Sequence, residues 1–186
     1  IHGEGPTSTG LIVSSAHIAS GAGNISLSGL GGGFGAGVSI GQESSVSTTT
    51  GDVDIDGTSS SYVGVQLNVG DVATTSGDIR IAGTGGTVGV RLFSGDVATT
   101  SGDIYITGIG GSDVGLRLDA AADVDAGSGL VALAASNAGA SDAIVLQGSI
   151  ASTTGVNLRS ANEADTILLG AGNGFSLTSA ELATID

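Results

Sequence analysis

A nine-residue segment occurs twice in this chain, 25 positions apart, and no other feature constrains the fold as strongly. Residues 71–79 and residues 96–104 both read DVATTSGDI. The segments that precede and follow these copies also match, as VGVQL at 63–67, VGVRL at 88–92 and VGLRL at 114–118. Near-identical units at this period are typical of solenoid proteins, so the sequence predicts one supersecondary unit stacked on its own copies.

Each unit carries three apolar stations, in which aliphatic residues recur at alternate positions. The first station has the columns Ile25, Val53, Ile79, Ile104, Leu130 and Leu27, Ile55, Ile81, Ile106, Ala132. The second has Val38, Val65, Val90, Leu116, Ile144 and Ile40, Leu67, Leu92, Leu118, Leu146, and the third has Val46, Val72, Val97, Val124, Ile150. A step of two is the strand period, because alternate side chains of a strand share a face. Glycine and small polar residues separate the stations, and we expect them at corners.

These stations predict an all-β fold, a parallel β-helix with three short strands per coil and about seven coils of 25–28 residues. Right-handed winding is favoured by the general bias of parallel crossover connections. A β-sandwich is the main alternative, since it also uses short strands and glycine-rich turns, but it does not explain near-identical units in register. We expect residues 1–186 to form a single repeat domain. The first ten residues resemble no signal peptide and carry no initiator Met, so the chain is expected to be an internal fragment of a longer one.

The charge balance excludes several classes of partner. Eighteen acidic residues against four arginines and no lysine give a net charge of −14. Nucleic acid binding and anionic membrane surfaces are therefore disfavoured, and no segment approaches the roughly 20 apolar residues that membrane insertion requires. The chain contains no cysteine, so it has no disulfide and no cysteine-bound metal. The acidity has two interpretations, which are solubility with repulsion between rods, or binding of a divalent cation.

The acidic residues are partly ordered in columns. Asp52, Asp78 and Asp103 follow corner glycines, with Asn24 in the equivalent place, and Asp71, Asp96 and Asp123 precede the third station. Stacking would bring like charges within about 5 Å and raise their pKa values unless something compensates. Bound Ca²⁺ or the backbone N–H groups of the corners could compensate, and the acceptance of Asn at position 24 favours the corner role. We assign no metal ligand and no cofactor-binding residue, and Ca²⁺ stays open.

Two further patterns have a structural and a functional interpretation. The segment ADTILLGAGNG at 164–174 resembles one nonapeptide of the calcium-binding RTX toxins, but that motif binds metal only when successive copies face each other. Threonines recur at one corner, at 48–50, 74–75, 99–100 and 153–154. Adjacent threonines of a strand point opposite ways, so hydroxyls bonded to the backbone are favoured over an ice-binding ladder.

Catalytic chemistry finds little support in the sequence. His2 and His17 are the only histidines, and no Ser-His-Asp spacing surrounds them. A carboxylate pair such as Asp52 and Asp54 is usually solvated surface, and Arg91 and Arg117 stack in one column with few aromatic residues to hold sugar. We assign no catalytic residue and expect no enzyme, with a polysaccharide-acting enzyme as a weaker alternative.

Several sequence segments of the coils resemble those of a known family. SGAGNISLSG at 20–29, TGDVDIDG at 50–57, SGDIRIAG at 76–83 and SGDIYITG at 101–108 are similar to the filamentous haemagglutinin-like large exoproteins of two-partner secretion in Gram-negative bacteria. The secretion-signal domain of that family and its NPNG- and NPNL-type motifs are not found in this sequence. By the same resemblance, residues 174–186 would open a further repeat block.

The resemblance implies a rigid extracellular β-helical shaft of an adhesin, secreted to the bacterial cell surface and used in adhesion or cell-cell contact. Its partner would be a host or neighbouring cell surface, or another copy stacked end to end. A calcium-dependent binding module or surface-layer element is the alternative.

Overall fold

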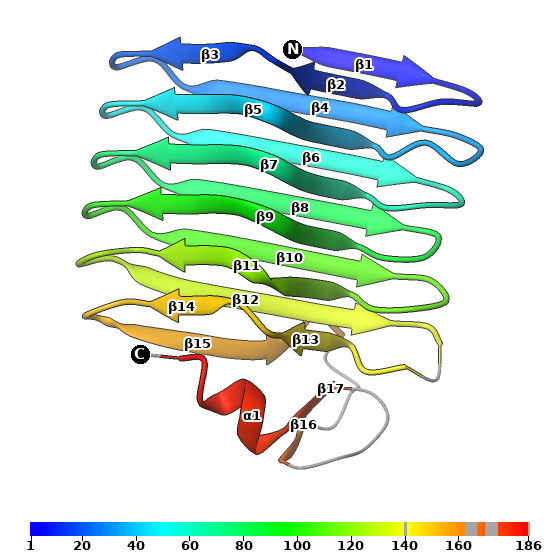
Figure 1. The fold of residues 1–186 in the computed structure, drawn as a ribbon, viewed down its shortest axis with the longest axis vertical. Helices are drawn as coiled ribbons and strands as arrows, with labels where there is room; N and C mark the ends of the chain where they lie inside the picture. Colours follow the sequence, from blue (N-terminus) through cyan, green and yellow to red (C-terminus); the bar gives the residue numbers. More distant parts are fainter. Residues whose placement is uncertain (140, 163–166, 170–174, 186) are drawn as a thin grey trace.

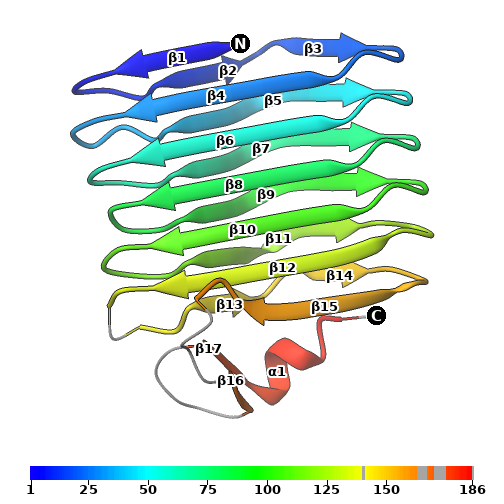
Figure 2. The same ribbon diagram turned by 180° about the vertical axis from the view of Figure 1, so that it is seen from behind.

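Two parallel sheets face each other along a stack of coils (Figure 1). The structure is a computed structural model and describes residues 1–139, 141–162, 167–169 and 175–185. The first sheet contains, in spatial order, β1 (His2–Gly5), β4 (Ile25–Gly31), β6 (Val53–Ser59), β8 (Ile79–Gly85), β10 (Ile104–Gly110), β12 (Leu130–Asn137) and β15 (Gly155–Ser160). Figure 2 shows from behind that these strands all run in the same direction.

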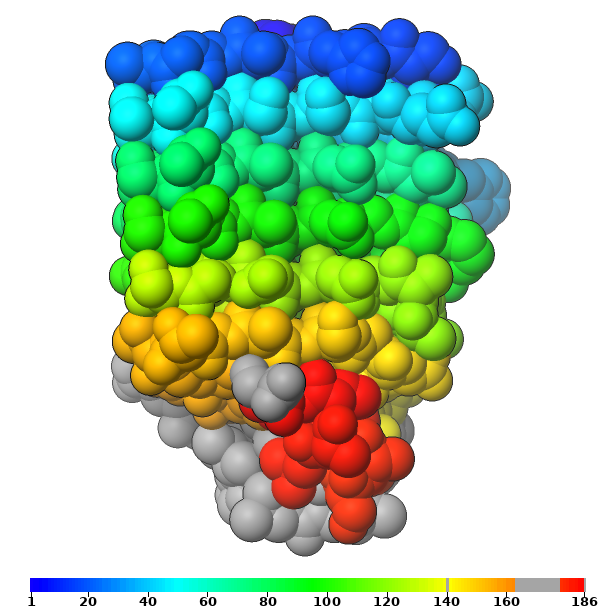
Figure 3. All heavy atoms as spheres, turned by 60° about the vertical axis from the view of Figure 1, so that its left-hand side comes forward, coloured from blue at the N-terminus to red at the C-terminus, as the bar shows by residue number. Residues whose placement is uncertain are grey.

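The second sheet contains, in spatial order, β13 (Ile144–Leu146), β11 (Leu116–Asp125), β9 (Val90–Thr99), β7 (Val65–Thr74), β5 (Val38–Thr48) and β2 (Leu11–Ser14). Two short strands pair at its ends, β3 (His17–Ser20) with β5 and β14 (Ser149–Ala151) with β11. The chain thus makes about six turns, and the predicted all-β parallel β-solenoid is confirmed. In the space-filling view the turns lie as successive bands of colour (Figure 3).

The second and third stations share one long strand in the middle of the stack. Strands β5, β7, β9 and β11 each carry both stations across a shift of register, such as that between Gly41 and Ser44. At the ends of the sheet the two stations fall on separate strands, β2 with β3 and β13 with β14. The three-strand coil therefore holds at the ends, and a short strand with a long bulged strand replaces it between. Left-handed φ angles of 53° at Gln42, 57° at Glu43 and 58° at Val69 absorb the bend, so pairing continues on both sides of it.

The apolar columns form one continuous core. Val38, Val65, Val90, Leu116 and Ile144 are paired in register from coil to coil and are fully buried, and so are the other predicted columns of the second and third stations, apart from traces of exposure at Val124 and Leu146. Each aliphatic side chain thus stacks on its own kind, which repeats one packing solution along the axis.

The first station is shifted in its last coil, and the predicted column was wrong there. Ile104 pairs with Val131 rather than with Leu130, so Val131 is in the core and Leu130 is half-buried. The cause lies at the corner, where Leu130 N–H donates to the Asp103 carboxylate at 2.8 Å. In the coil above, the same kind of bond is made by the backbone of Asp103, to Asp78 at 3.0 Å. Leu130 therefore occupies a corner position and the strand residues follow one place later.

Some of the glycines expected at corners lie inside strands and face the interior. Gly29, Gly57, Gly83 and Gly108 are paired in register within the first sheet and buried. A Cβ on Gly57 would lie 2.2 Å from the carbonyl oxygen of Gly64. The two backbones approach too closely here for any side chain, so the coil narrows beyond its aliphatic core.

The C-terminal residues pack beneath the last coil. Strands β16 (Ile167–Leu169) and β17 (Phe175–Leu177) pair with each other, and α1 (Ser179–Leu182) follows with a capping box between Thr178 and Glu181. The buried Glu181 carboxylate also accepts the Leu146 N–H at 3.2 Å, which satisfies one donor at the edge of the second sheet. That residues 174–186 open a further repeat block stays a prediction. No helix among the described residues is long and apolar enough to cross a membrane.

Candidate functional site

The acidic column at the corner of the first sheet is a hydrogen-bonded ladder. Each side chain accepts the backbone N–H of the next coil, Asn24 from Asp52 at 2.9 Å and Asp52 from Asp78 at 2.9 Å. The ladder continues through Asp103 to Leu130. The Leu130 N–H and the Tyr105 hydroxyl, which donates at 2.8 Å, lower the pKa of Asp103. The corner role expected for these residues is confirmed.

A cation neutralises the outward side of this ladder. The Arg80 guanidinium lies 2.7 Å from the Asp78 carboxylate and 3.9 Å from that of Asp52, and it stacks over the Tyr105 ring at 5.2 Å. Two carboxylates therefore surround one guanidinium, which leaves this corner without excess positive charge.

The second acidic column is less well compensated. Asp71, Asp96 and Asp123 follow one another on the outer face of the second sheet, and the Asp71 carboxylate accepts the Asp96 N–H at 3.1 Å. Partial burial, followed by the charges of Asp71 and Asp123, raises the pKa of Asp96. Among the described residues no group of three or more His, Asp or Glu side chains is placed to hold a metal ion. Most of the RTX-like segment 164–174 lies outside the described residues.

The recurrent corner threonines bond mainly to backbone oxygens. Thr74 Oγ1 donates to the carbonyl of Gly77 at 2.6 Å, and the Thr48 hydroxyl bonds in the same way to Gly51. These two hydroxyls are buried, so they close the corner and are not presented to water.

The histidines lie on exposed strand faces. His2 contacts Ser28 Oγ through Nδ1 at 2.7 Å and Glu4 through Nε2 at 3.1 Å, because the strand period places residues 2 and 4 on one face and β1 pairs His2 with Ser28. The side chains of His2 and Glu4 are 60% and 67% exposed. Water competes for every one of these contacts, so the arrangement lacks the desolvated surroundings that activate a nucleophile. His17 Nδ1 contacts Ser45 Oγ at 2.8 Å on the second sheet.

The second sheet also presents an arginine pair, which we call the arginine clamp and define as Arg91, Arg117 and Asp119. Arg91 and Arg117 are directly paired on β9 and β11. Asp119 accepts Nε of Arg91 at 2.9 Å and Nε of Arg117 at 2.7 Å, and it is only 9% exposed. Burial alone would raise the pKa of Asp119, but the hydrogen bonds from the two arginines outweigh it and the pKa is lowered. Arg91 also lies over the Phe93 ring at 5.2 Å.

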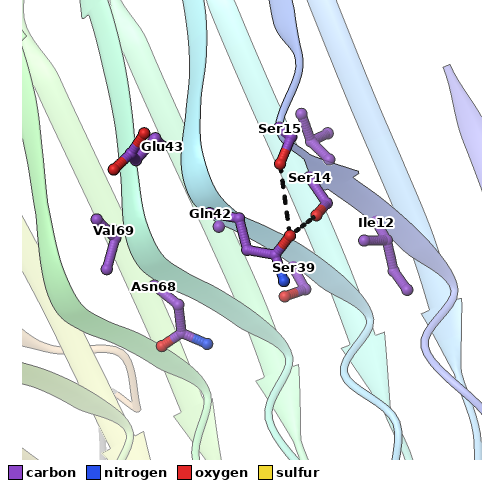
Figure 4. Close-up of a pocket in the computed structure, with 10 residues that line it drawn as sticks. Ile12, Ser14, Ser15, Ser39, Gln42, Glu43, Asn68 and Val69 are labelled. Atoms are coloured by element: carbon purple, nitrogen blue, oxygen red, sulfur yellow. Dashed lines mark hydrogen bonds between the residues drawn. The ribbon is translucent and has the colours of Figure 1, made fainter.

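A shallow groove of about 600 Å³ lies on the same sheet as the clamp, beside the bulge of β5 and β7 (Figure 4). Its walls include Ile12, Ser14, Gln42, Asn68 and Val69. Ser14 Oγ donates to Gln42 Oε1 at 2.6 Å, which fixes the amide at the groove wall. The groove offers uncharged hydrogen-bonding groups and one carboxylate, that of Glu43, beside exposed aliphatic side chains.

Sequence reasoning found part of these surfaces. The stacking of Arg91 and Arg117 was predicted from the repeat and is confirmed. Asp119 was missed, although its place two residues after Arg117 puts the two side chains on one face of the strand. The groove was missed because it depends on a bulge that no periodicity marks.

Comparison with known proteins identifies one family. The profile of the family described as Toastrack DUF4097 matches residues 7–173. Comparisons with curated proteins and with solved structures return no match.

Proposed function

The chain belongs to the Toastrack DUF4097 family, and from its β-solenoid structure we propose that it is a rigid segment of a larger surface adhesin. The observation that carries the proposal is the parallel pairing of the stack, which continues from coil to coil on both sides of each bulge. Strands of both sheets pair in parallel from coil to coil, with matching residues opposite each other over most of the chain. Such a stack resists bending, since any bend must break hydrogen bonds in neighbouring coils together.

Side-chain ladders support the same role. The Asn24–Asp103 ladder at one corner ties neighbouring coils together beyond the strand hydrogen bonds, and a contact of 2.9 Å between Thr74 Oγ1 and Thr99 Oγ1 adds one more link at the same turn. These bonds pair backbone groups at the corners and so stabilise the stack on which a spacer depends. A spacer that transmits force or holds a binding domain at a distance gains from every such bond.

The similarity of the repeated sequence segments to those of filamentous haemagglutinin-like exoproteins supports a secreted location and a role in adhesion or cell-cell contact. The net charge of −14 is consistent with rods that repel one another and stay dispersed. We assign the segment no catalytic role, no nucleic acid partner and no membrane insertion. Its partner would be a host or neighbouring cell surface, or a further copy.

The test is the size and location of the native product in fractionated producer cells, detected with an antibody against this segment. A product much larger than this chain at the cell surface or in the medium is the expected result. A product confined to the cell interior would contradict the surface role. Producer cells with the segment deleted in frame should then adhere less, or should hold the binding domain closer to the cell surface.

A calcium-dependent module is the second candidate, favoured by the negative charge gathered along the Asp71, Asp96 and Asp123 column, although these side chains do not form a ready-made cation site among the described residues. Calcium bound to these carboxylates would neutralise their negative charge and so stabilise the folded state. Melting with millimolar Ca²⁺ and with chelator tests it. A melting temperature that is unchanged between the two conditions would remove this candidate.

A further inference from the structure

The arginine clamp concentrates positive charge on a strongly acidic protein. Like charges opposite each other on neighbouring strands destabilise a sheet, yet Arg91 and Arg117 are paired directly. One buried carboxylate, Asp119, is shared between both Nε groups. At the corner of the first sheet the ratio is reversed, because two carboxylates surround the single Arg80. The clamp therefore keeps an excess of positive charge, whereas the positive charge of Arg80 is neutralised at its corner.

The outer ends of both guanidinium groups are available and held in place. Asp119 occupies only the Nε side of each group, and among the described residues no acceptor contacts their terminal Nη atoms. The side chains of Arg91 and Arg117 are 35% and 34% exposed. The Phe93 ring beneath Arg91 and the buried Asp119 restrict their rotation. Two preoriented sets of N–H donors thus lie side by side, about 4.8 Å apart along the axis, as an oxyanion requires.

Neutral polar groups continue the clamp along the rod. Gln66 is paired with Arg91 in the coil above, and its amide donates to Ser39 Oγ at 3.0 Å. Asn68 follows on the same face and borders the groove of Figure 4. Amide and hydroxyl groups in a row beside an exposed Phe93 ring suit a chain of hydroxyl-bearing rings better than a charged peptide.

We propose that the clamp binds the carboxylate of a uronic-acid polysaccharide whose chain runs along the rod axis over Gln66 and Asn68. This inference rests on the proposed surface function in one respect, which is that a segment at the cell surface would encounter such a polymer. Arg91 and Arg117 supply the charge-assisted hydrogen bonds, and Asp119 positions them without contacting the ligand. Acidic polysaccharide on a cell surface is then the ligand class of the segment.

Calorimetry on the purified chain tests the proposal, with oligogalacturonate as the probe and its methyl ester as the matched neutral ligand. EDTA is present throughout, so that no cation bridges two carboxylates. Oligogalacturonate should bind and the ester should not. Arg117→Gln and Arg91→Gln should each weaken binding about tenfold or more, since each removes charge-assisted hydrogen bonds. Arg80→Gln is the control, with the same change in net charge on the other sheet and an expected effect of at most about twofold.

Each single variant leaves Asp119 one arginine partner, so the fold is expected to survive, and thermal melting confirms it before binding is measured. Absence of oligogalacturonate binding by the unaltered chain would overturn the proposal. Equal weakening by Arg80→Gln and the clamp variants would also overturn it, as would polyglutamate binding as tightly as the sugar. A chain that binds in calorimetry but is found inside the producer cell would contradict the surface role and leave the clamp intact.

Discussion

At the scale of single residues, aspartate side chains have opposite effects at two positions of the coil. At the corner, Asp103 accepts a backbone N–H and a phenolic hydroxyl, and its pKa is lowered. On the strand, partial burial and then the neighbouring carboxylates of Asp71 and Asp123 raise the pKa of Asp96. Position in the repeat, rather than residue type, therefore decides whether an acid stabilises the stack. The two cases lead to separate predictions.

Replacing Asp103 tests the corner ladder. Asp103→Ala removes the acceptor of the Leu130 N–H and should cost about 1–3 kcal/mol of unfolding free energy, because a partly buried donor is left unpaired. Asp103→Asn keeps an acceptor oxygen in the same place, as Asn24 does at the N-terminal end of the ladder. This variant should therefore lose less unfolding free energy than Asp103→Ala. Urea denaturation of both variants measures the difference. Equal losses for Ala and Asn would show that the acceptor is not what matters.

Replacing Asp96 tests the repulsion on the strand. The folded pKa of Asp96 is raised above 3.8, so its ionised form destabilises the fold at neutral pH, and stability returns as pH falls through the raised value. Asp96→Asn should therefore be more stable than the parent at neutral pH, by about 0.2–1 kcal/mol. The advantage should vanish below the unfolded pKa. Asp103 and Asp119 have lowered pKa values and act in the opposite direction, since their contribution is lost as pH falls through those values.

Melting temperatures of Asp96→Asn and the parent across this pH range measure the effect. Asp125→Asn is a control on the same strand as Asp123, outside the Asp71–Asp96–Asp123 column. A parent and variant that differ by the same amount at every pH would contradict the electrostatic account.

At the scale of elements, the features that recur from coil to coil could be predicted from the sequence, and the local departures from the repeat could not. The columns of the second and third stations could be predicted because aliphatic residues return at the same phase in each coil. The long bulged strands could not, since Gln42, Glu43 and Val69 take left-handed φ angles without being glycine. The displaced Leu130 escaped for a similar reason, because a corner and a strand residue can both be Leu. Asp119 was missed because the residues at its level in other coils are not acidic.

The interior glycines are the element-scale feature that a single substitution can test. Gly83→Ala places a Cβ 2.2 Å from the carbonyl oxygen of Gly89, so the two sheets must move apart. We expect a loss of about 1–3 kcal/mol, the usual cost of overpacking. Gly21→Ala is the matched control, because a Cβ there meets nothing within 4 Å. Chemical denaturation of the pair measures this, and equal stability of the two variants would show that the close approach of the sheets is not a constraint.

At the scale of the whole molecule, stability is a sum over coils and their contacts, and no residue contacts a distant part of the stack except through its neighbours. The identical segments at 71–79 and 96–104 then permit a test with no foreign junction. Deleting residues 71–95 joins Gly70 to Asp96, and the sequence across the join still reads NVGDVATTSGDI. Every column of the core keeps its phase, because one whole coil has been removed.

We expect this deletion to fold cooperatively into a rod shorter by about 4.8 Å, the rise of one coil. Its melting temperature should fall only modestly, since one internal coil and its contacts are lost while both ends are unchanged. Circular dichroism, thermal melting and small-angle scattering measure these quantities. Deletion of residues 71–83 is the control, because it removes half a coil and places strands of the first sheet opposite strands of the second. If both deletions fold equally well, stacking in register is not what stabilises the molecule; if neither folds, the coils are not independent units and the spacer role loses its physical basis.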